Sequence, residues 1–179
     1  MSGMTVRGLE HSAVFPDGSS IGMRPLDHGD GRQVSQFRGQ MSEESEYFRF
    51  LVGGGSQIKR WVPRLLNSDQ IDNLAHGAFA SNRFGSTLVA VAESIRYEDR
   101  PDTAEFAMVA IDPWQGMGVG TLLARHLAAY ASATGIRFWE AYSLAENRRM
   151  ERLLNRIGTK VETRLDSRLV ATVRDISTM

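Results

Sequence analysis

The sequence predicts a mixed α/β (α+β) domain, and three observations support this prediction. Short apolar runs alternate with longer segments in which apolar residues recur at helical spacing. The apolar run 106–111 leads through Gly116, Gly118 and Gly120 into a helical pattern that ends at Gly135, which is typical of a strand, a turn and a helix. No internal repeat is present, so a solenoid or repeat array is excluded.

The first part of the chain contains one expected strand and two expected helices. Residues 1–19 are polar and glycine-rich, so we expect an extension there. The apolar run 21–23 predicts a short strand, and the segment 27–40 predicts a helix. In the segment 42–46, a serine followed by three glutamates predicts an N-cap and the acidic first turn of a second helix.

The middle of the chain is expected to supply a pair of strands. Gly53-Gly54-Gly55 predicts a flexible break, and residues 68–77 predict a short helix that Ser68 caps and Gly77 ends. Residues 87–95 form the clearest buried strand. A charged turn over residues 97–103 then returns the chain into an antiparallel strand over residues 104–111.

The last part of the chain alternates helices and strands. A helix from Gly118 should end at Gly135, which suits a C-terminal glycine cap. Residues 136–142 predict a strand. The apolar residues between 150 and 157 then share one helical face, which Gly158 ends. Residues 161–165 and 169–173 predict a closing hairpin.

Length and composition agree with one soluble domain, which we place at residues 20–179. The chain has 179 residues, of which 42% are hydrophobic and 23% are charged, as is usual for a globular protein. Lys and Arg together number 21, and so do Asp and Glu. This balance argues against nucleic acid as the main partner, because nucleic-acid-binding domains usually carry a basic excess.

Several function classes are excluded by residues that the chain lacks. It contains no cysteine, so disulfides, a thiolate zinc site and a cysteine nucleophile are ruled out. Its four histidines show no metal-ligand spacing, and we expect no metal; His126 lies on an apolar helix face and is expected to be a packing residue. No run approaches the ~18 apolar residues of a membrane span, and the N-terminus lacks a secretory apolar region. We therefore expect a cytoplasmic protein without a membrane partner.

The glycine turn predicts an anion site. Glycines let the backbone turn tightly and approach a ligand, and the N–H groups that start a helix lack internal partners. Such a turn suits a phosphate or pyrophosphate. A P-loop would need Lys and Ser or Thr after the last glycine, but Gly120 is followed by Thr121 and Leu122. The nicotinamide or flavin fingerprint needs G-x-G-x-x-G, whereas the spacing here is G-x-G-x-G.

The remaining pattern resembles a known family. Gln115-x-x-Gly118-x-Gly120 matches the acetyl-coenzyme A loop of the GNAT N-acetyltransferases, Arg/Gln-x-x-Gly-x-Gly/Ala. The family's opening strand and turn resemble residues 21–27, and its helix after the next strand resembles residues 147–158. The resemblance covers residues from about 20 to the C-terminus. It implies the GNAT fold, a mixed and mostly antiparallel sheet of about six to seven strands flanked by helices.

One subgroup of this family is most similar. Arg24-Pro25 and the segment Met41-Ser-Glu-Glu-Ser-Glu-Tyr-Phe-Arg-Phe50 look like the opening of bacterial protein-lysine acetyltransferases that modify acyl-CoA synthetases. Their domain is often fused to a larger regulatory domain, and we identify no such domain in these 179 residues. Related stand-alone domains act on many amines. The acceptor therefore stays open between a protein lysine and a small molecule.

The resemblance also implies how acetyl-CoA is held. Backbone groups of Val109 and Ile111 would bond the pantetheine arm and the acetyl carbonyl. Backbone N–H groups of the loop would cradle the pyrophosphate, namely those of Gln115, Gly116, Met117, Gly118, Val119, Gly120 and Thr121. Asn147 would contact the pantetheine arm, or else simply cap the next helix. Among the arginines 148, 149, 152 and 156, most are expected to lie on a solvated face, and one is a candidate for the ribose 3′-phosphate.

Acetyl transfer to an amine requires a base, because an ammonium group is not nucleophilic and lysine has a pKa of about 10.4. Glu105 matches the catalytic glutamate of the subgroup, and the other interpretation of this residue is a solvent-facing strand position. Glu93 on the adjacent strand is the reserve candidate. Tyr142 is the tyrosine nearest the usual position of the acid but is expected to be a core aromatic, which leaves water as the proton donor.

The sequence thus predicts an N-acetyltransferase that moves acetyl directly from acetyl-CoA to a primary amine, preferably a protein lysine, in a ternary complex. A small-molecule amine N-acetyltransferase would keep the loop and the base but close the acceptor pocket. A non-catalytic acyl-CoA sensor would keep the loop alone. Whether the protein forms a homodimer is also left open.

Overall fold

The computed structural model describes residues 12–14, 20–51, 55–82 and 85–179, and the side chains of residues 20–51, 59–81 and 85–179. In this part of the chain eight strands form one sheet, in the order β1-β2-β3-β4-β5-β6-β8-β7. The strands are β1 (Ser12–Val14), β2 (Ser20–Pro25), β3 (Asn73–Asn82), β4 (Gly85–Arg96), β5 (Thr103–Ala110), β6 (Phe138–Leu144), β7 (Thr159–Asp166) and β8 (Leu169–Asp175). All neighbours run antiparallel except β5 and β6.

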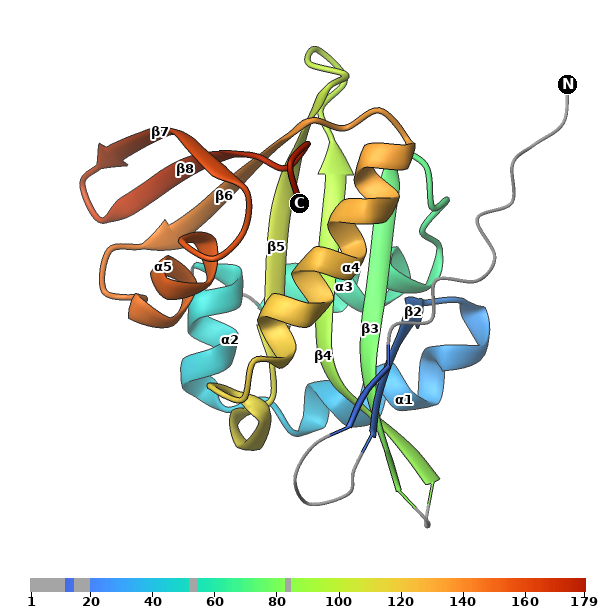
Figure 1. Cartoon of the computed structure of the whole chain (residues 1–179). Helices are drawn as coiled ribbons and strands as arrows, with labels where there is room; N and C mark the ends of the chain where they lie inside the picture. The colour runs from blue at the N-terminus through green and yellow to red at the C-terminus, as the bar shows by residue number, and fades with distance from the viewer. Residues whose placement is uncertain (1–11, 15–19, 52–54, 83–84) are drawn as a thin grey trace, which may run out of the picture.

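Five helices flank the sheet among the described residues. They are α1 (Gly31–Gly39), α2 (Glu43–Phe50), α3 (Gly55–Leu66), α4 (Val119–Ala133) and α5 (Arg148–Leu154), with short 3₁₀ turns η1 (His28–Asp30) and η2 (Asp112–Trp114). In Figure 1, α4 crosses one face of the sheet, whereas α1 and α3 lie on the opposite face. Helices α2 and α5 lie near the end of the sheet where β5 and β6 separate. None of the helices in the described ranges is long and apolar enough to cross a membrane.

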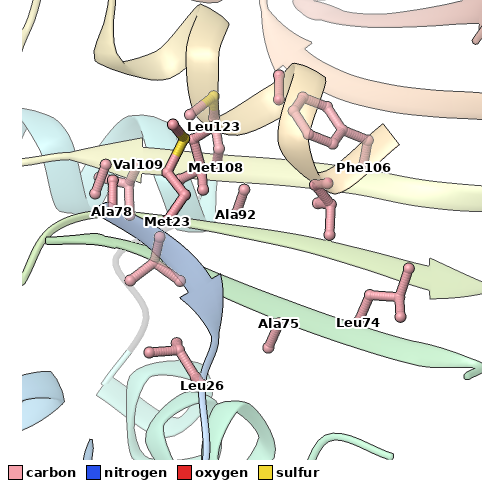
Figure 2. Packing of buried hydrophobic residues seen from close by; sticks show 14 of the residues in the cluster. Met23, Leu26, Leu74, Ala75, Ala78, Ala92, Phe106, Met108, Val109 and Leu123 are labelled. Carbon is pink, nitrogen blue, oxygen red and sulfur yellow. The ribbon is translucent and has the colours of Figure 1, made fainter. Parts of the chain in front are cut away.

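The core is continuous on both faces of the sheet. Leu123 and Leu127 of α4 are fully buried on one side, and Phe37 of α1 and Trp61 of α3 are buried in the same apolar cluster. Figure 2 shows part of this cluster, in which side chains from β2, β3, β4, β5 and α4 pack together. The strands next to the site are therefore anchored from two sides, which keeps the site residues in fixed positions.

Most of the expected elements are confirmed. Ser42 caps α2 through a hydrogen bond that its side chain accepts from the N–H of Ser45. Helix α4 begins after Gly118 and ends before Gly135, whose φ of +88° is the left-handed conformation expected of a glycine cap. The antiparallel β4–β5 pair and the closing β7–β8 hairpin are also present. The segment 27–40 is helical but divides into η1 and α1.

The expected helix over residues 68–77 is wrong. The carboxylate of Asp69 accepts hydrogen bonds from the N–H groups of Ile71, Asp72 and Asn73, which forms a turn. The chain then enters β3, which pairs with both β2 and β4. Tertiary pairing has overridden the local helical preference of this alanine-containing segment.

Three other differences concern single elements. Helix α3 was not expected, and the expected glycine break falls largely on residues 52–54, outside the described residues. The expected 136–142 strand is β6 and begins two residues later. Besides β3, one further strand was not expected: Ser12–Val14, within the expected extension 1–19, pairs with β2.

Candidate functional site

The sheet opens between its two parallel strands. Strand β6 pairs with β5 only at three positions, the last of which joins Glu105 to Glu140. Beyond that pair β6 continues along β8, while β5 continues alongside β4 through Ala110. Figure 1 shows β6 turning away from β5. Over residues 106–110, the edge of β5 that faces away from β4 is left without a β6 partner in the described part of the chain, so its peptide groups can bond an extended ligand.

A cavity of about 330 Å³ lies at this opening. Its walls come from α2, from the second half of β5, from the glycine turn and the start of α4, and from α5. The lining residues are Ser45, Phe48, Arg49, Met108, Val109, Ala110, Asp112, Trp114, Gln115, Gly116, Gly118, Gly120, Thr121, Asn147, Arg149, Met150, Arg152, Leu153 and Arg156. A volume of this size is within the usual range for small-molecule sites.

The glycine turn shapes one end of the cavity. Gly116 has a φ of +78° and Gly118 a φ of +89°, which are left-handed conformations that only glycine adopts without strain. Gly118 is the N-cap of α4, and no side chain caps the helix there. A Cβ on Gly120 would lie 3.3 Å from Cε of Met108, so this glycine permits close packing of α4 on β5. The first two glycines shape the turn, and the third brings the helix start near the strand.

Gln115 links the turn to α2 through hydrogen bonds of its side chain. Its amide Nε2 donates to the Ala110 carbonyl at 2.8 Å, to Oγ of Ser45 at 3.0 Å and to Oδ1 of Asp112 at 3.2 Å. The same Asp112 oxygen accepts from Ser42 at 3.0 Å and from Ser45 at 2.8 Å. The two serines of the segment 42–46 therefore connect α2 to the residues before the turn. This role could not be predicted from the sequence, because their partner Asp112 lies about 70 residues away.

Helix α5 forms the opposite wall. Oδ1 of Asn147 accepts from the N–H of Met150 at 3.0 Å, so the capping role is confirmed, and Asn147 also lines the cavity. Arg149, Arg152 and Arg156 line the cavity, whereas Arg148 is exposed and pairs with Glu151. Three cations near a glycine turn suit a ligand with several phosphates.

Three glutamates lie on one face of neighbouring strands, with very different partners. The register pairs Glu93 of β4 with Ala107, and it pairs Glu105 of β5 with Glu140 of β6. This face is the one under α2 and α3, since Glu93 contacts both helices. The three carboxylates therefore lie in one row across the opening of the sheet.

The carboxylate of Glu93 is already bonded to donors from three residues and is not available as a base. Its carboxylate is buried and accepts hydrogen bonds from Arg49, from Nε1 of Trp61 at 2.7 Å and from Nε of Arg64 at 3.0 Å. The reserve candidate is therefore a structural anchor that joins α2, α3 and β4.

Glu140 is saturated in a similar way by Arg100 at 2.8 Å and Arg164 at 2.5 Å. Burial alone would raise the pKa of Glu140, but the hydrogen bonds and positive charges, chiefly of Arg100, outweigh burial and lower the pKa.

Glu105 differs from both neighbours. It is half-buried, and within the described residues it forms no salt bridge with Lys or Arg. Tyr97 lies close enough for the Glu105 charge to act on it. Burial, the adjacent Tyr142 hydroxyl and the carboxylates of Glu140 and Glu105 all raise the Tyr97 pKa above its usual value. A carboxylate that no cation neutralises can accept a proton.

The structure brings together most of the predicted cofactor residues. Seven line the cavity, namely Val109, Gln115, Gly116, Gly118, Gly120, Thr121 and Asn147. Ile111 and Val119 have buried side chains, so these two could contribute only backbone groups, and Met117 is exposed but is not among the lining residues. Glu105 lies outside the lining, four residues before Val109 on the same strand face. Sequence reasoning missed Ser45, Phe48 and Arg49, although their segment was noted for its resemblance.

Among the residues that the structure describes, no cluster of three or more His, Asp or Glu side chains could hold a metal ion. His126 is buried and packs against His76 and Tyr130, with ring centroids 5.0 and 5.1 Å away. Burial and the neighbouring His126 lower the pKa of His76 well below its usual value. These rings belong to the packing between α4 and β3, away from the residues that line the cavity.

Comparison with known proteins identifies the class of protein that this fold and cavity define. The model of the acetyltransferase (GNAT) family matches residues 43–159, which include α2, the glycine turn and α5. The chain therefore belongs to the GNAT acetyltransferase family, and it is an acetyltransferase.

Named relatives support the same class. The chain is 30% identical over 156 residues to acetyltransferase PA5475 of Pseudomonas aeruginosa, covering 86% of this chain and 82% of that protein. It is 26% identical over 156 residues to acetyltransferase Pat of Mycolicibacterium smegmatis, again over 86% of this chain, but it spans only 45% of Pat. Less than half of that second relative is therefore represented here.

Solved structures agree on the fold. The GNAT domain of S. lividans PAT superposes with a TM-score of 0.77 at 26% identity, covering 93% of this chain and 96% of that domain. A cAMP-binding acyltransferase from Mycobacterium smegmatis has a TM-score of 0.63 at 23% identity, covering 93% of this chain and 47% of that one. The latter similarity is evidence for the fold alone.

Proposed function

We propose that this protein is an acetyl-CoA-dependent N-acetyltransferase that transfers acetyl directly to a primary amine, a protein lysine, in a ternary complex. Glu105 is the general base. The observation that carries the proposal is the arrangement of one open cavity, with a glycine-built anion site at one end and a carboxylate free of cations beyond the other.

The geometry of β5 supports acetyl-CoA as the donor. The pyrophosphate would lie on the N–H groups at the start of α4, where the helix dipole favours negative charge. The pantetheine arm would run along β5 past Ile111 and Val109, at an edge that no strand of the described residues occupies beyond Glu105. Its thioester would then lie between Val109 and Glu105, a span of about 13 Å at ~3.3 Å per residue.

The surroundings of Glu105 support an open acceptor site. Arg100 and Arg164, which flank the neighbouring Glu140, are 44% and 56% exposed at their side chains. An extended lysine side chain could enter beside them while the rest of its protein stays outside. A small amine would require a more enclosed pocket to be held from all sides.

Direct transfer is supported by the chemistry of the chain. It contains no cysteine, so the commonest acyl-enzyme route is closed. The amine nitrogen attacks the thioester carbonyl carbon, Glu105 accepts a proton from nitrogen, directly or through water, and the C–S electron pair leaves with sulfur. Holding both substrates in one complex supplies the orientation that this attack needs.

A substrate panel tests this function. Thiol release from acetyl-CoA would be followed with free amines and with lysine-containing proteins, and the same proteins with methylated lysines would serve as controls. We expect release only with unmodified proteins, with acetyl groups on lysines by mass spectrometry. Transfer to free amines alone would contradict the protein acceptor, and binding of acetyl-CoA without any transfer would contradict catalysis.

A further inference from the structure

Arg49 is the one cation of α2 that lines the cavity, and its environment is unusual. The side chain is only 9% exposed, and Nη2 donates to the buried carboxylate of Glu93. Its guanidinium carbon lies 5.3 Å from the ring centroid of Phe50 and 5.5 Å from that of Trp61. A salt bridge and two aromatic rings therefore hold the guanidinium in one place.

The remaining N–H groups of Arg49 take no part in the hydrogen bond to Glu93. The structure gives no hydrogen-bond partner to Nε or Nη1 among the described residues, and neither atom is sealed off from solvent-sized space. The residue also lines the cavity, so these donors are the groups of Arg49 that are left to bond a ligand there. Arg64 is the natural contrast, because it also donates to Glu93 but does not line the cavity.

The position of Arg49 along the cavity corresponds to the reacting end of the donor. Its partner Glu93 is paired in the sheet with Ala107, which lies between Val109 and Glu105 on β5. The glycine turn lies at the opposite end of the same strand. A thioester placed at this level of β5 would therefore lie beside the guanidinium.

We infer that Arg49, held by Glu93, is a catalytic residue that stabilises the coenzyme A thiolate as it leaves. This role rests on the proposed function. When the tetrahedral intermediate collapses, the C–S bond breaks and its electron pair stays on sulfur, while the proton taken from the amine is on Glu105 or in solvent. The fixed positive charge stabilises the thiolate until that proton reaches sulfur and yields the free thiol. No tyrosine acid is needed in this scheme.

The pKa of the coenzyme A thiol in its complex with the protein tests this inference directly. The ultraviolet absorbance of the thiolate would be titrated in the wild type, in Arg49→Met and in Arg64→Met. We expect the bound thiol to have a lower pKa than free coenzyme A, and Arg49→Met to raise it by ~1 unit or more, since a cation within a few ångströms shifts a pKa by that much. The kcat of Arg49→Met should fall by about 10²-fold, the usual worth of one donor at a developing charge.

Two comparisons separate this role from a structural one. Arg64→Met removes another cation from Glu93 and should leave the thiol pKa and kcat nearly unchanged. If Arg49→Met does not fold, Arg49→Met combined with Glu93→Gln removes both charges of the pair and should show the same rise in thiol pKa.

An unchanged thiol pKa in a folded Arg49 variant, or equal effects of the Arg49 and Arg64 variants, would overturn the inference. Failure of the wild type to bind coenzyme A or to acetylate any amine would instead overturn the proposed function.

Discussion

The two ends of the cavity are built in different ways. The end that we assign to the pyrophosphate is made of backbone within six consecutive residues, 115–120, with two glycines in the left-handed region. At the end that we assign to the acetyl group, the lining comes from α2 and β5, and the carboxylates beyond it come from β4, β5 and β6, which are far apart in the sequence. The first end depends on the local conformation of the backbone. The second depends on which carboxylates form salt bridges with residues from other elements.

The largest expected effect is on the stability of the fold, when the carboxylate that pairs with Arg49 is removed. Glu93→Ala should lower the free energy of unfolding by about 3 kcal/mol, because it leaves the buried Arg49 without its carboxylate. Glu105→Ala should change it by no more than about 0.5 kcal/mol, since no salt bridge is lost. Urea denaturation of the two variants measures both values. Equal losses would remove the distinction between a structural and an available glutamate.

A second prediction concerns the backbone-built end. Gly118→Val should weaken acetyl-CoA binding by about 100-fold or more, because a β-branched residue at a φ of +89° is strained and would displace the N–H groups of the turn. Calorimetry measures the affinity. Gly135→Val is the matched control, since Gly135 has a φ of +88° at the far end of α4. It should lose stability but keep its affinity, and a parallel loss of affinity would contradict a specific role for the turn.

The smallest expected effect is the acid sensitivity that Glu140 confers. Its pKa in the folded protein is held below the ordinary value of 4.5, despite burial, by Arg100 and Arg164. A lowered pKa stabilises the fold above pH 4.5, and this contribution is lost as the pH falls through the folded-state pKa. Glu140→Gln should therefore flatten the decline of Tm below pH 4.5. An unaltered decline would indicate that other carboxylates carry it.

The conformation of the glycine turn could be predicted from the sequence because its signals are local. Gly118 and Gly120 next to an apolar strand define the turn, and Gly135 marks the end of the helix. The same local reasoning failed for β3, where Ser68 and Gly77 were interpreted as the cap and the end of a helix, whereas the chain pairs with β2 and β4.

The side-chain-built end was only partly predictable. Glu105 and Glu93 are both carboxylates on neighbouring apolar strands, and the sequence gives no means of ranking them by charge. The contacts that saturate Glu93 come from residues 44, 32 and 29 positions earlier, in α2 and in a helix that was not expected. Arg49 was part of a recognised segment, but its place in the cavity lining follows only from the position of α2 in the fold.

We assign acetyl-CoA binding to one end of the site and catalysis to the other. The most direct test of this assignment compares acetyl-CoA binding and turnover in Glu105→Gln. The substitution keeps the size of the side chain and removes its ability to accept a proton. With Glu105 as the base, kcat should fall by roughly 10²–10⁴-fold, while the Kd for acetyl-CoA should stay within about twofold of the wild type. Full turnover by Glu105→Gln, or a loss of acetyl-CoA affinity that accounts for the lost activity, would contradict the assignment of the two ends.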